Sequence, residues 1–286
     1  MNVLILGGNG YLGSKVTRRL AEAGHYVVCT KRQNSDLSRL KDLEAGIKWI
    51  PASVDAVEVA AKYTSFDFVI NMACNYGREN ALYDNVLDAN IEFPLKVLNK
   101  TMECGTRHFI TIGTGLPDKL NLYSFSKKVL NEFGRFYVEK HGIDFCCLQL
   151  ELFYGADEPR NRFLPSIIDR MIRGEEVNTT LGTQRRDIIS AEDIINAVIL
   201  VFHSELNGYN EVPVGTGIAP TVSEVVDFIW EETGRKSRVV KGSIPQRSNE
   251  PDCVADIRKI CSLGQWRPVP WKQGIKQMIE IMEDER

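Results

Sequence analysis

The sequence predicts an α/β protein in which a doubly wound parallel sheet is followed by a smaller C-terminal α/β lobe. Apolar runs alternate with amphipathic helical patterns over the first half of the 286-residue chain. A glycine-rich turn joins the first apolar run to the first helical pattern. After about residue 152 the pattern breaks into short elements separated by glycine and proline, which indicates a second lobe.

Each short apolar run of the first half is typical of a parallel strand, because such strands are buried on both faces. The alternation predicts right-handed crossovers and a ligand site at the carboxyl ends of the strands. We therefore expect a dinucleotide-binding domain over residues 1–152 and a mainly substrate-binding lobe over residues 153–286, from which segments can return to the first domain. The expected strands are residues 3–6, 26–30, 47–50, 66–71, 108–112 and 145–150, and the expected helices are residues 11–23, 37–43, 56–62, 85–104 and 123–141.

Composition and charge narrow the class of protein. The chain is 43% hydrophobic and 26% charged, as in soluble globular proteins, and its net charge of -3 argues against general nucleic-acid binding. We find no apolar run of membrane-spanning length and no signal peptide before the first strand. The seven cysteines are scattered without metal-ligand or redox spacing, so we expect reduced thiols and no metal site. These features predict a cytoplasmic enzyme that binds neither a membrane nor nucleic acid.

The first strand runs into glycines at spacings that suit a phosphate-binding turn. Gly7 permits a tight turn, Gly10 lets backbone approach a pyrophosphate, and Gly13 lets the next helix pack close to the strand. With Tyr11 and Leu12 they open a helix whose N-terminal N–H groups and dipole attract phosphate. This order of strand, glycines and helix predicts a Rossmann-like dinucleotide site, with an ordinary strand–helix turn as the alternative.

The end of the second strand bears on the choice of cofactor. An acidic side chain here would accept hydrogen bonds from the ribose hydroxyls of NAD, whereas the chain has the cations Lys31 and Arg32, which suit the 2′-phosphate of NADP. A solvated basic loop is the alternative. Asp55, after the third strand, is expected either to face the adenine or to cap the following helix. Met72 and Ala73 follow the fourth strand, where we expect backbone to approach the cofactor.

Tyr123 and Lys127 are the candidates for the chemical step. Residues four apart lie on one face of a helix, so the Lys127 ammonium would favour the phenolate form of Tyr123 and prepare it for proton transfer. A tyrosine and a lysine four residues apart are weak evidence for an active site by themselves. The position of this pair strengthens the evidence, because it lies at the start of a helix just after the loop of the fifth strand. Thr114, at the end of that strand, is placed to hydrogen-bond a substrate carbonyl beside Tyr123, and a role in the turn is the alternative.

These residues resemble the extended short-chain dehydrogenase/reductase family, in its branch that acts on nucleotide sugars. The resemblance covers nearly the whole chain and implies a Rossmann-like fold, an NAD(P) cofactor and a nucleotide-diphosphate sugar as substrate. Thr114, Tyr123 and Lys127 match the Ser/Thr, Tyr and Lys of the family's catalytic set. The expected cofactor contacts are Gly7, Gly10, Tyr11, Leu12, Gly13, Lys31, Arg32, Asp55, Met72, Ala73, Asn90, Tyr123 and Lys127.

Motifs of the second half resemble the family's substrate lobe. Phe153 opens a segment similar to the family's Tyr-Gly segment, and Arg186 opens a segment similar to its Arg-Asp…Asp motif, whose arginine contacts the diphosphate. Arg247 begins a segment that resembles the family's C-terminal nucleotide-contacting one. The resemblance implies that Arg186 and Arg247, joined by Arg162, clamp the diphosphate, whereas a surface salt bridge from Arg186 to a nearby aspartate is the alternative. The expected substrate contacts are Asn75, Thr114, Phe153, Arg162, Arg186 and Arg247.

Departures from the family pattern narrow the reaction. The family's 4,6-dehydratases follow the catalytic Ser/Thr with an Asp-Glu pair, whereas Gly115 and Leu116 follow Thr114 here. The cysteine that family epimerase–reductases place near this position is also absent. The loop from Thr114 to Tyr123 is short and resembles that of reductases that make deoxysugars such as CDP-abequose.

The resemblance therefore implies NADPH-dependent reduction of the C4 keto group of a nucleotide-activated sugar, such as a 6-deoxy or dideoxy hexose or a heptose. Tyr123 would give a proton to the carbonyl oxygen, Thr114 would orient that oxygen, and Lys127 would hold the nicotinamide ribose. We also expect a homodimer. Two alternatives stay open: an NAD-dependent nucleotide-sugar 4-epimerase, and a non-catalytic dinucleotide-binding sensor of cofactor redox state.

Overall fold

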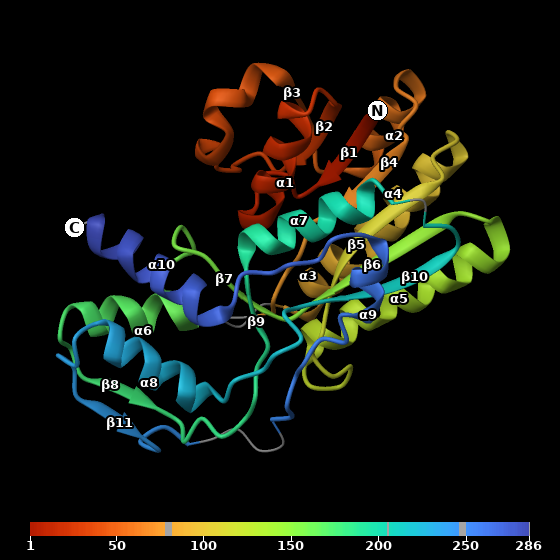
Figure 1. The fold of residues 1–286 in the computed structure, drawn as a ribbon. Coiled ribbons are helices and arrows are strands. Elements are labelled where there is room, and N and C mark those ends of the chain that lie inside the picture. Colours follow the sequence, from red (N-terminus) through yellow and green to blue (C-terminus); the bar gives the residue numbers. More distant parts are fainter. Residues whose placement is uncertain (78–81, 205, 246–249, 286) are drawn as a thin grey trace. The chain divides into compact units, whose positions relative to one another are not determined.

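The computed structural model (Figure 1) describes residues 1–77, 82–204, 206–245 and 250–285. The chain folds into two compact units. The first unit contains Met1–Gln149 and Val198–Val212, and the second contains Leu150–Ala197 and Pro213–Arg286. None of the helices in the described ranges combines the length and apolar character needed to cross a lipid bilayer.

A seven-stranded sheet with the order β3-β2-β1-β4-β5-β6-β10 forms the first unit. The pairs β1/β2, β2/β3, β1/β4 and β4/β5 are parallel. The reversal of strand order beside β1 is that of a doubly wound Rossmann-like fold, which confirms the predicted fold class. The strands are β1 (Asn2–Leu6), β2 (Tyr26–Lys31), β3 (Ile47–Pro51), β4 (Phe68–Asn71), β5 (His108–Thr114), β6 (Asp144–Leu150) and β10 (Tyr209–Val214).

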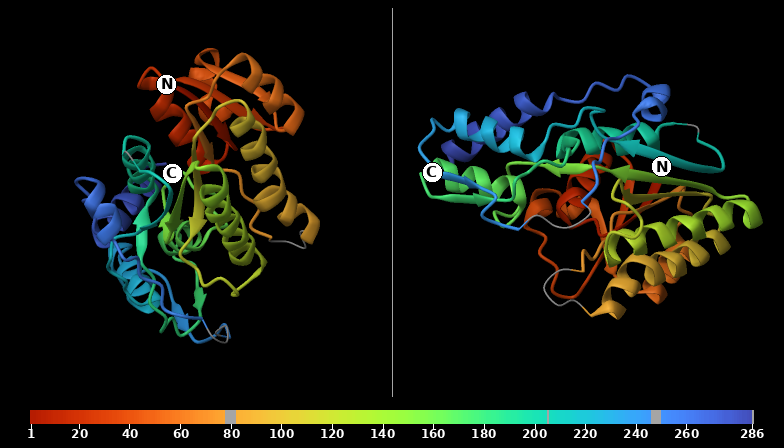
Figure 2. Two further views of the ribbon diagram at one scale, coloured as in Figure 1. Left: turned by 90° about the vertical axis from the view of Figure 1, so that its right-hand side faces the viewer. Right: turned by 90° about the horizontal axis from the view of Figure 1, so that it is seen from below.

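Helices α2 (Val54–Tyr63), α4 (Phe93–Glu103) and α5 (Leu122–His141) share a core with one face of this sheet (Figures 1 and 2). Their apolar side chains pack against strand residues that are fully buried, such as Val69 and Phe109. Helix α1 (Tyr11–Glu22) follows β1 and contacts a 3₁₀ segment over Ser38–Gly46. We expected a helix over residues 37–43, and the structure has a 3₁₀ helix there instead of an α-helix.

The expected helix over residues 85–104 is interrupted in the structure. It begins as α3 (Tyr83–Leu87), passes through a π-helical turn over Asp88–Glu92 and continues as α4. A π turn widens the helix and is frequent at functional sites. Here it contains Asn90, whose side chain is buried.

In the second unit two short parallel strand pairs pack with three helices around a separate core. That core is made of apolar residues such as Ile168, Val226 and Ile275. Helix α7 (Ala191–Phe202) begins in this unit and ends in the first. The other elements are β7 (Leu152–Tyr154) paired with β9 (Ile188–Ser190), β8 (Val177–Thr179) paired with β11 (Val239–Lys241), and helices α6 (Phe163–Ile172), α8 (Val222–Glu232), α9 (Arg258–Leu263) and α10 (Trp271–Asp284).

Candidate active site

The glycine turn between β1 and α1 depends on the absence of side chains. Gly7 has a φ of +73°, and a Cβ at this position would lie 2.9 Å from the backbone of Ala73. A Cβ on Gly13 would lie 2.1 Å from the Gly7 carbonyl oxygen. Gly10 is the N-cap residue of α1 and supplies no side-chain acceptor to the first N–H groups of that helix. The turn therefore fits a phosphate group, which can accept from these N–H groups.

The segment after β4 is held against this turn. Asn71 is buried, and its Nδ2 donates to Thr111 Oγ1 at 3.1 Å. Its Oδ1 accepts the Ala73 N–H at 3.2 Å, and the Met72 N–H donates to the Leu6 carbonyl at 2.9 Å. The backbone at Met72 and Ala73 is thus fixed beside the glycine turn, where the sequence predicts a cofactor contact.

Asn90 connects the π turn to two other segments. Its Oδ1 accepts the Asn75 N–H at 2.7 Å, and its Nδ2 donates to the Asn75 carbonyl at 2.8 Å and to Ser126 Oγ at 2.9 Å. Ser126 Oγ donates in turn to the Tyr123 carbonyl at 2.8 Å. Both amide protons of Asn90 are thus used to hold the start of α5 against the segment after β4. Ser126 was not predicted, although it lies between the tyrosine and the lysine of the motif.

The first turn of α5 is fixed by a capping box. Asn121 Oδ1 accepts the Ser124 N–H at 2.8 Å, and Ser124 Oγ accepts the Asn121 N–H at 3.2 Å. This places Tyr123 in the first turn of the helix and Lys127 one turn later.

Tyr123 and Lys127 lie near the segment after β4. The Lys127 side chain is buried, and its Nζ donates to the Ala73 carbonyl at 3.4 Å. The Tyr123 ring packs on the ring of Tyr76, with centroids 5.1 Å apart and planes inclined by 38°. The structure therefore brings the Tyr–Lys pair and the segment beside the glycine turn into one part of the first unit. Tyr76 was missed by the sequence reasoning because no motif marks it.

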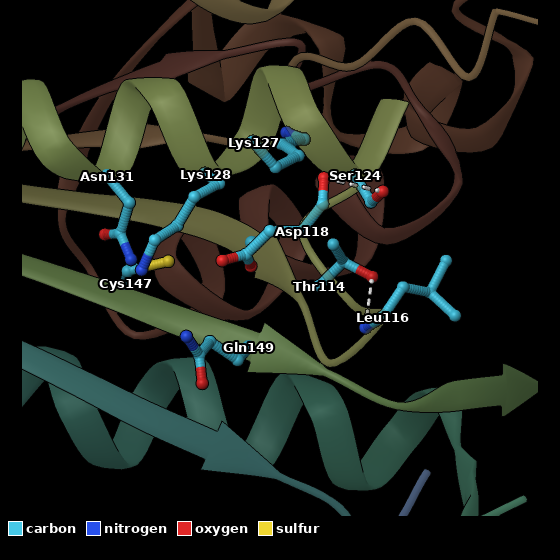
Figure 3. Close-up of a pocket in the computed structure, with 10 residues that line it drawn as sticks. Thr114, Leu116, Asp118, Ser124, Lys127, Lys128, Asn131, Cys147 and Gln149 are labelled. Carbon is cyan, nitrogen blue, oxygen red and sulfur yellow. Dashed lines mark hydrogen bonds between the residues drawn. The ribbon is translucent and has the colours of Figure 1, made fainter. Parts of the chain in front are cut away.

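Thr114, the last residue of β5, lines a small pocket together with Lys127 (Figure 3). Thr114 Oγ1 accepts the Leu116 N–H at 3.2 Å, which leaves its own O–H to donate elsewhere. Asp118, from the same loop, adds a carboxylate to the pocket that the motif comparison did not indicate. The lining residues are Gly113, Thr114, Leu116, Asp118, Ser124, Lys127, Lys128, Asn131, Cys147 and Gln149.

The residues that are expected to determine the preference for NADP or NAD lie at the end of β2. Thr30 Oγ1 accepts the Gly7 N–H at 3.3 Å, so the strand ends beside the glycine turn. Lys31 is the last strand residue, and the exposed Arg32 follows it. Asp55 lies in the first turn of α2, whose N-cap is Ser53. The alternative that Asp55 caps this helix was therefore wrong.

In the second unit Arg186 is buried rather than exposed. Its Nη2 lies 3.3 Å from Glu250 Oε1, and its Nη1 donates to the carbonyls of Arg185 and Pro251. The alternative of a surface salt bridge to an aspartate of its own motif was therefore wrong. The neighbouring Asp187 does not pair with Arg186 in this way. Its carboxylate accepts hydrogen bonds from the backbone N–H groups of residues 216, 217 and 255.

The other predicted substrate residues make separate contacts. Arg162 is the N-cap residue of α6, and its guanidinium lies 6.0 Å from the Phe153 ring centroid and 3.4 Å from the Glu158 carboxylate. Arg247 lies outside the residues that the structure describes.

A carboxyl group that the sequence reasoning did not single out lies near the Arg-Asp motif. Burial raises the pKa of Glu151 to about 7; the Asp187 carboxylate adds to this shift, and the Arg186 guanidinium opposes it. Glu151 directly precedes β7 in the second unit.

Comparisons with known proteins show which sequences and folds this chain is similar to. The chain is 28% identical to the CDP-abequose synthase of Salmonella typhimurium, with 97% of each chain covered. It also resembles the fold of the UDP-glucose 4-epimerase of Thermotoga maritima, solved with UDP-glucose, with a TM-score of 0.86 and 22% identity over 100% of this chain and 99% of that one. A UDP-glucuronic acid 4-epimerase of Bacillus cereus, solved with UDP-glucuronic acid and NAD, gives a TM-score of 0.84 at 18% identity, with both chains fully covered (100% each). The sequence model of one family matches residues 3–215, and the chain therefore belongs to the NAD dependent epimerase/dehydratase family.

Proposed function

We propose that this protein is an NADPH-dependent reductase of the C4 keto group of a nucleotide-activated 6-deoxy or dideoxy sugar. The observation that carries the proposal is that Lys127 donates to Ala73 and the Tyr123 ring packs on Tyr76, both in the segment after β4, while Thr114 and Lys127 line one pocket. The similarity to CDP-abequose synthase supports a nucleotide sugar as the substrate. The absence of an Asp-Glu pair directly after Thr114 favours reduction over dehydration.

In this mechanism the side chains bind and protonate the carbonyl oxygen. Tyr123 donates its phenolic proton to that oxygen as a general acid. Thr114 donates a second hydrogen bond, because its Oγ1 already accepts from Leu116 and its proton remains for the substrate. Lys127, held at Ala73, supplies a positive charge beside the phenol and a donor for the ribose.

The cofactor site follows from the glycine turn. The N–H groups at the start of α1 would hold the pyrophosphate, and the fixed backbone at Met72 and Ala73 would contact the cofactor. Lys31 and Arg32 at the end of β2 suit the 2′-phosphate of NADP. When bound, NADPH supplies the hydride that adds to C4 of the sugar.

In the second unit we assign the diphosphate to Arg186, with Arg162 and Arg247 as further cations. Arginine suits this task because its planar fork matches phosphate oxygens. Phe153 and Asn75 are the proposed contacts to the rest of the substrate.

A screen of purified protein with NADPH and NADH against a panel of nucleotide-4-keto sugars tests the proposal. Oxidation of NADPH that depends on one of these sugars, and is faster than oxidation of NADH, would support it. The second candidate is a nucleotide-sugar 4-epimerase, which is favoured by the fold similarity to such enzymes. It would instead contain tightly held NAD and interconvert C4 epimers without net cofactor oxidation.

We further propose that the protein is a homodimer. Three aromatic side chains on α5 are 42–50% exposed: Phe125, Phe133 and Phe136. Their spacing places them on one side of the helix. Helix α3, which contacts α5, adds the exposed Tyr83 and Leu87. An exposed apolar patch of this kind is typical of a protein–protein interface.

A further inference from the structure

Arg186 and Glu250 form an ion pair in the second unit, at the arginine to which we assign the diphosphate. The 3.3 Å separation of Nη2 and Oε1 is accompanied by low exposure, 9% for the arginine side chain and 18% for the glutamate. The anion that this arginine holds is thus a carboxylate of the chain itself.

The guanidinium is oriented without help from Glu250. Its Nη1 donates to the Arg185 carbonyl at 2.9 Å and to the Pro251 carbonyl. Because two carbonyl groups accept from this one nitrogen, the plane of the Arg186 guanidinium is fixed and its Nη2 points toward the Glu250 carboxylate. An arginine held in this way can exchange one anion for another without reorganising its own side chain.

The segment that carries Glu250 is also anchored without that side chain. Asp252 Oδ1 accepts the Arg185 N–H at 2.7 Å, and the Cys253 N–H donates to the Arg185 carbonyl at 3.1 Å. The Cys253 carbonyl accepts the Asp187 N–H at 2.9 Å. These bonds follow Glu250 in the chain, so its side chain can leave Arg186 while the segment stays in place. Apart from Arg186, the structure gives the Glu250 carboxylate a hydrogen bond from Gln184 Nε2 at 2.9 Å.

We propose that Glu250 is an internal competitor for the anion site of Arg186. Its carboxylate occupies Nη2 until the diphosphate of the substrate replaces it, so Glu250 sets the affinity for the nucleoside diphosphate group. This inference rests on the proposed nucleotide-sugar substrate. Carboxylate and phosphate oxygens compete for the same donors of a guanidinium. A protein that must first release such a competitor binds its ligand more weakly, in proportion to the fraction of molecules in the competent state.

Calorimetry with CDP, UDP, dTDP and GDP tests this proposal on the full-length protein. Glu250→Gln keeps the size of the side chain and an acceptor for Gln184 but removes the charge that competes at Arg186. A nucleoside diphosphate that binds the wild type should bind this variant about ten-fold more tightly, if roughly one molecule in ten of the wild type is competent. In an Arg186→Gln background the same substitution should give no gain. Glu231→Gln is the matched control, since it removes one charge from an exposed pair with Arg235 in the same unit and should leave affinity unchanged.

Equal or weaker binding by a folded Glu250→Gln protein would overturn the proposal, and weaker binding would indicate that the carboxylate contacts the nucleotide. If this variant does not fold, Glu250→Asp keeps the charge but withdraws it from Nη2 by one methylene. It should also bind more tightly than the wild type, and equal or weaker binding would overturn the proposal.

Different results would overturn the reductase proposal and the Glu250 proposal. If Glu250→Gln tightens nucleotide binding but the protein reduces no 4-keto sugar, the Glu250 proposal is supported and the reductase proposal is overturned. Failure of all four nucleoside diphosphates to bind either the wild type or Glu250→Gln would overturn both.

Discussion

At the scale of single residues, the proposed chemistry depends on side chains whose positions are set by their neighbours. Ser126 and Asn90 hold the backbone at Tyr123, and the Ala73 carbonyl holds Lys127. The reactive groups need little rearrangement when their position is fixed in this way, which is how preorganised sites gain rate.

Tyr123→Phe should lower the rate of keto-sugar reduction by about 10²–10⁴-fold, because it removes the general acid and keeps the ring. Thr114→Val should give a smaller loss, since it removes one orienting hydrogen bond. Single-turnover rates measured beside melting temperatures check both variants. Tyr76→Phe is the control, because it keeps the ring contact with Tyr123 and should retain nearly normal turnover. A Tyr123→Phe protein that reduces the sugar at the wild-type rate would contradict the assignment.

Glu151 should make stability depend on pH. Its pKa is raised to about 7 in the folded protein, mainly by burial, so the folded state holds this proton more tightly than the unfolded chain. The stabilisation is complete below the unfolded pKa, near pH 4–5, and is lost as pH rises through about 7. Glu151→Gln should therefore raise the free energy of unfolding at pH 8 by about 1–3 kcal/mol and change it little below pH 5. Urea unfolding at both pH values checks this, and an equal effect of the substitution at both would rule out titration of Glu151.

At the scale of elements, α5 connects the proposed chemistry to the core of the first unit. It approaches β6 closely at Gly134, where a Cβ would lie 2.3 Å from the Phe145 ring. That ring is buried and stacked between Phe109 and Tyr209, so it has little room to move away. Close approach at this glycine therefore sets how tightly α5 packs on the sheet.

Gly134→Ala should lower the free energy of unfolding by about 1–2 kcal/mol, because the cost of overpacking exceeds the gain in helix propensity. Gly46→Ala is the matched control, since nothing lies within 4 Å of a Cβ there and the change should stay within about 0.5 kcal/mol. Denaturant unfolding of both variants provides the comparison. An unchanged or increased stability of Gly134→Ala would show that α5 can shift away from β6.

The sequence predicts elements well where one periodicity continues, and less well where it changes. The segments that became β1 to β6 were each identified. A central strand such as β1 is buried on both faces and leaves an uninterrupted apolar run, whereas the edge strand β3 has exposed residues. The π turn at Asp88–Glu92 was missed, because one inserted residue barely disturbs a helical pattern. The strand β10 was missed as well, since it comes from the irregular second half of the chain and joins the sheet only in three dimensions.

At the scale of the whole molecule, the family motifs predicted which residues meet in the first unit. The partners that hold them could not be predicted, because contacts such as Asn90 to Ser126 and Arg186 to Glu250 join positions far apart in the sequence. No local period or spacing encodes such pairs. The sequence therefore indicates the residues that we propose to be reactive better than the residues that position them.

The proposed dimer gives a prediction at the same scale. Phe136→Glu places a charge on the exposed aromatic face of α5 and should convert a dimer into a monomer, because a buried unpaired charge is costly at an interface. Phe163→Glu, on the exposed part of α6, is the control and should leave the dimer intact. Light scattering coupled to size-exclusion chromatography measures both masses. A wild-type monomer, or a Phe136→Glu dimer, would contradict the proposed interface.

The most direct test of the central claim is to follow the reducing hydrogen itself. Protein incubated with NADPH deuterated at nicotinamide C4, in each of its two stereospecific forms, and a nucleotide-4-keto sugar should give a product whose NMR spectrum shows deuterium at sugar C4 from one of the forms. The amount of deuterated product should equal the amount of NADPH oxidised. A product that forms without deuterium at C4 from either form, or a C4 epimer that forms with no oxidation of added NADPH, would contradict the reductase and favour the epimerase.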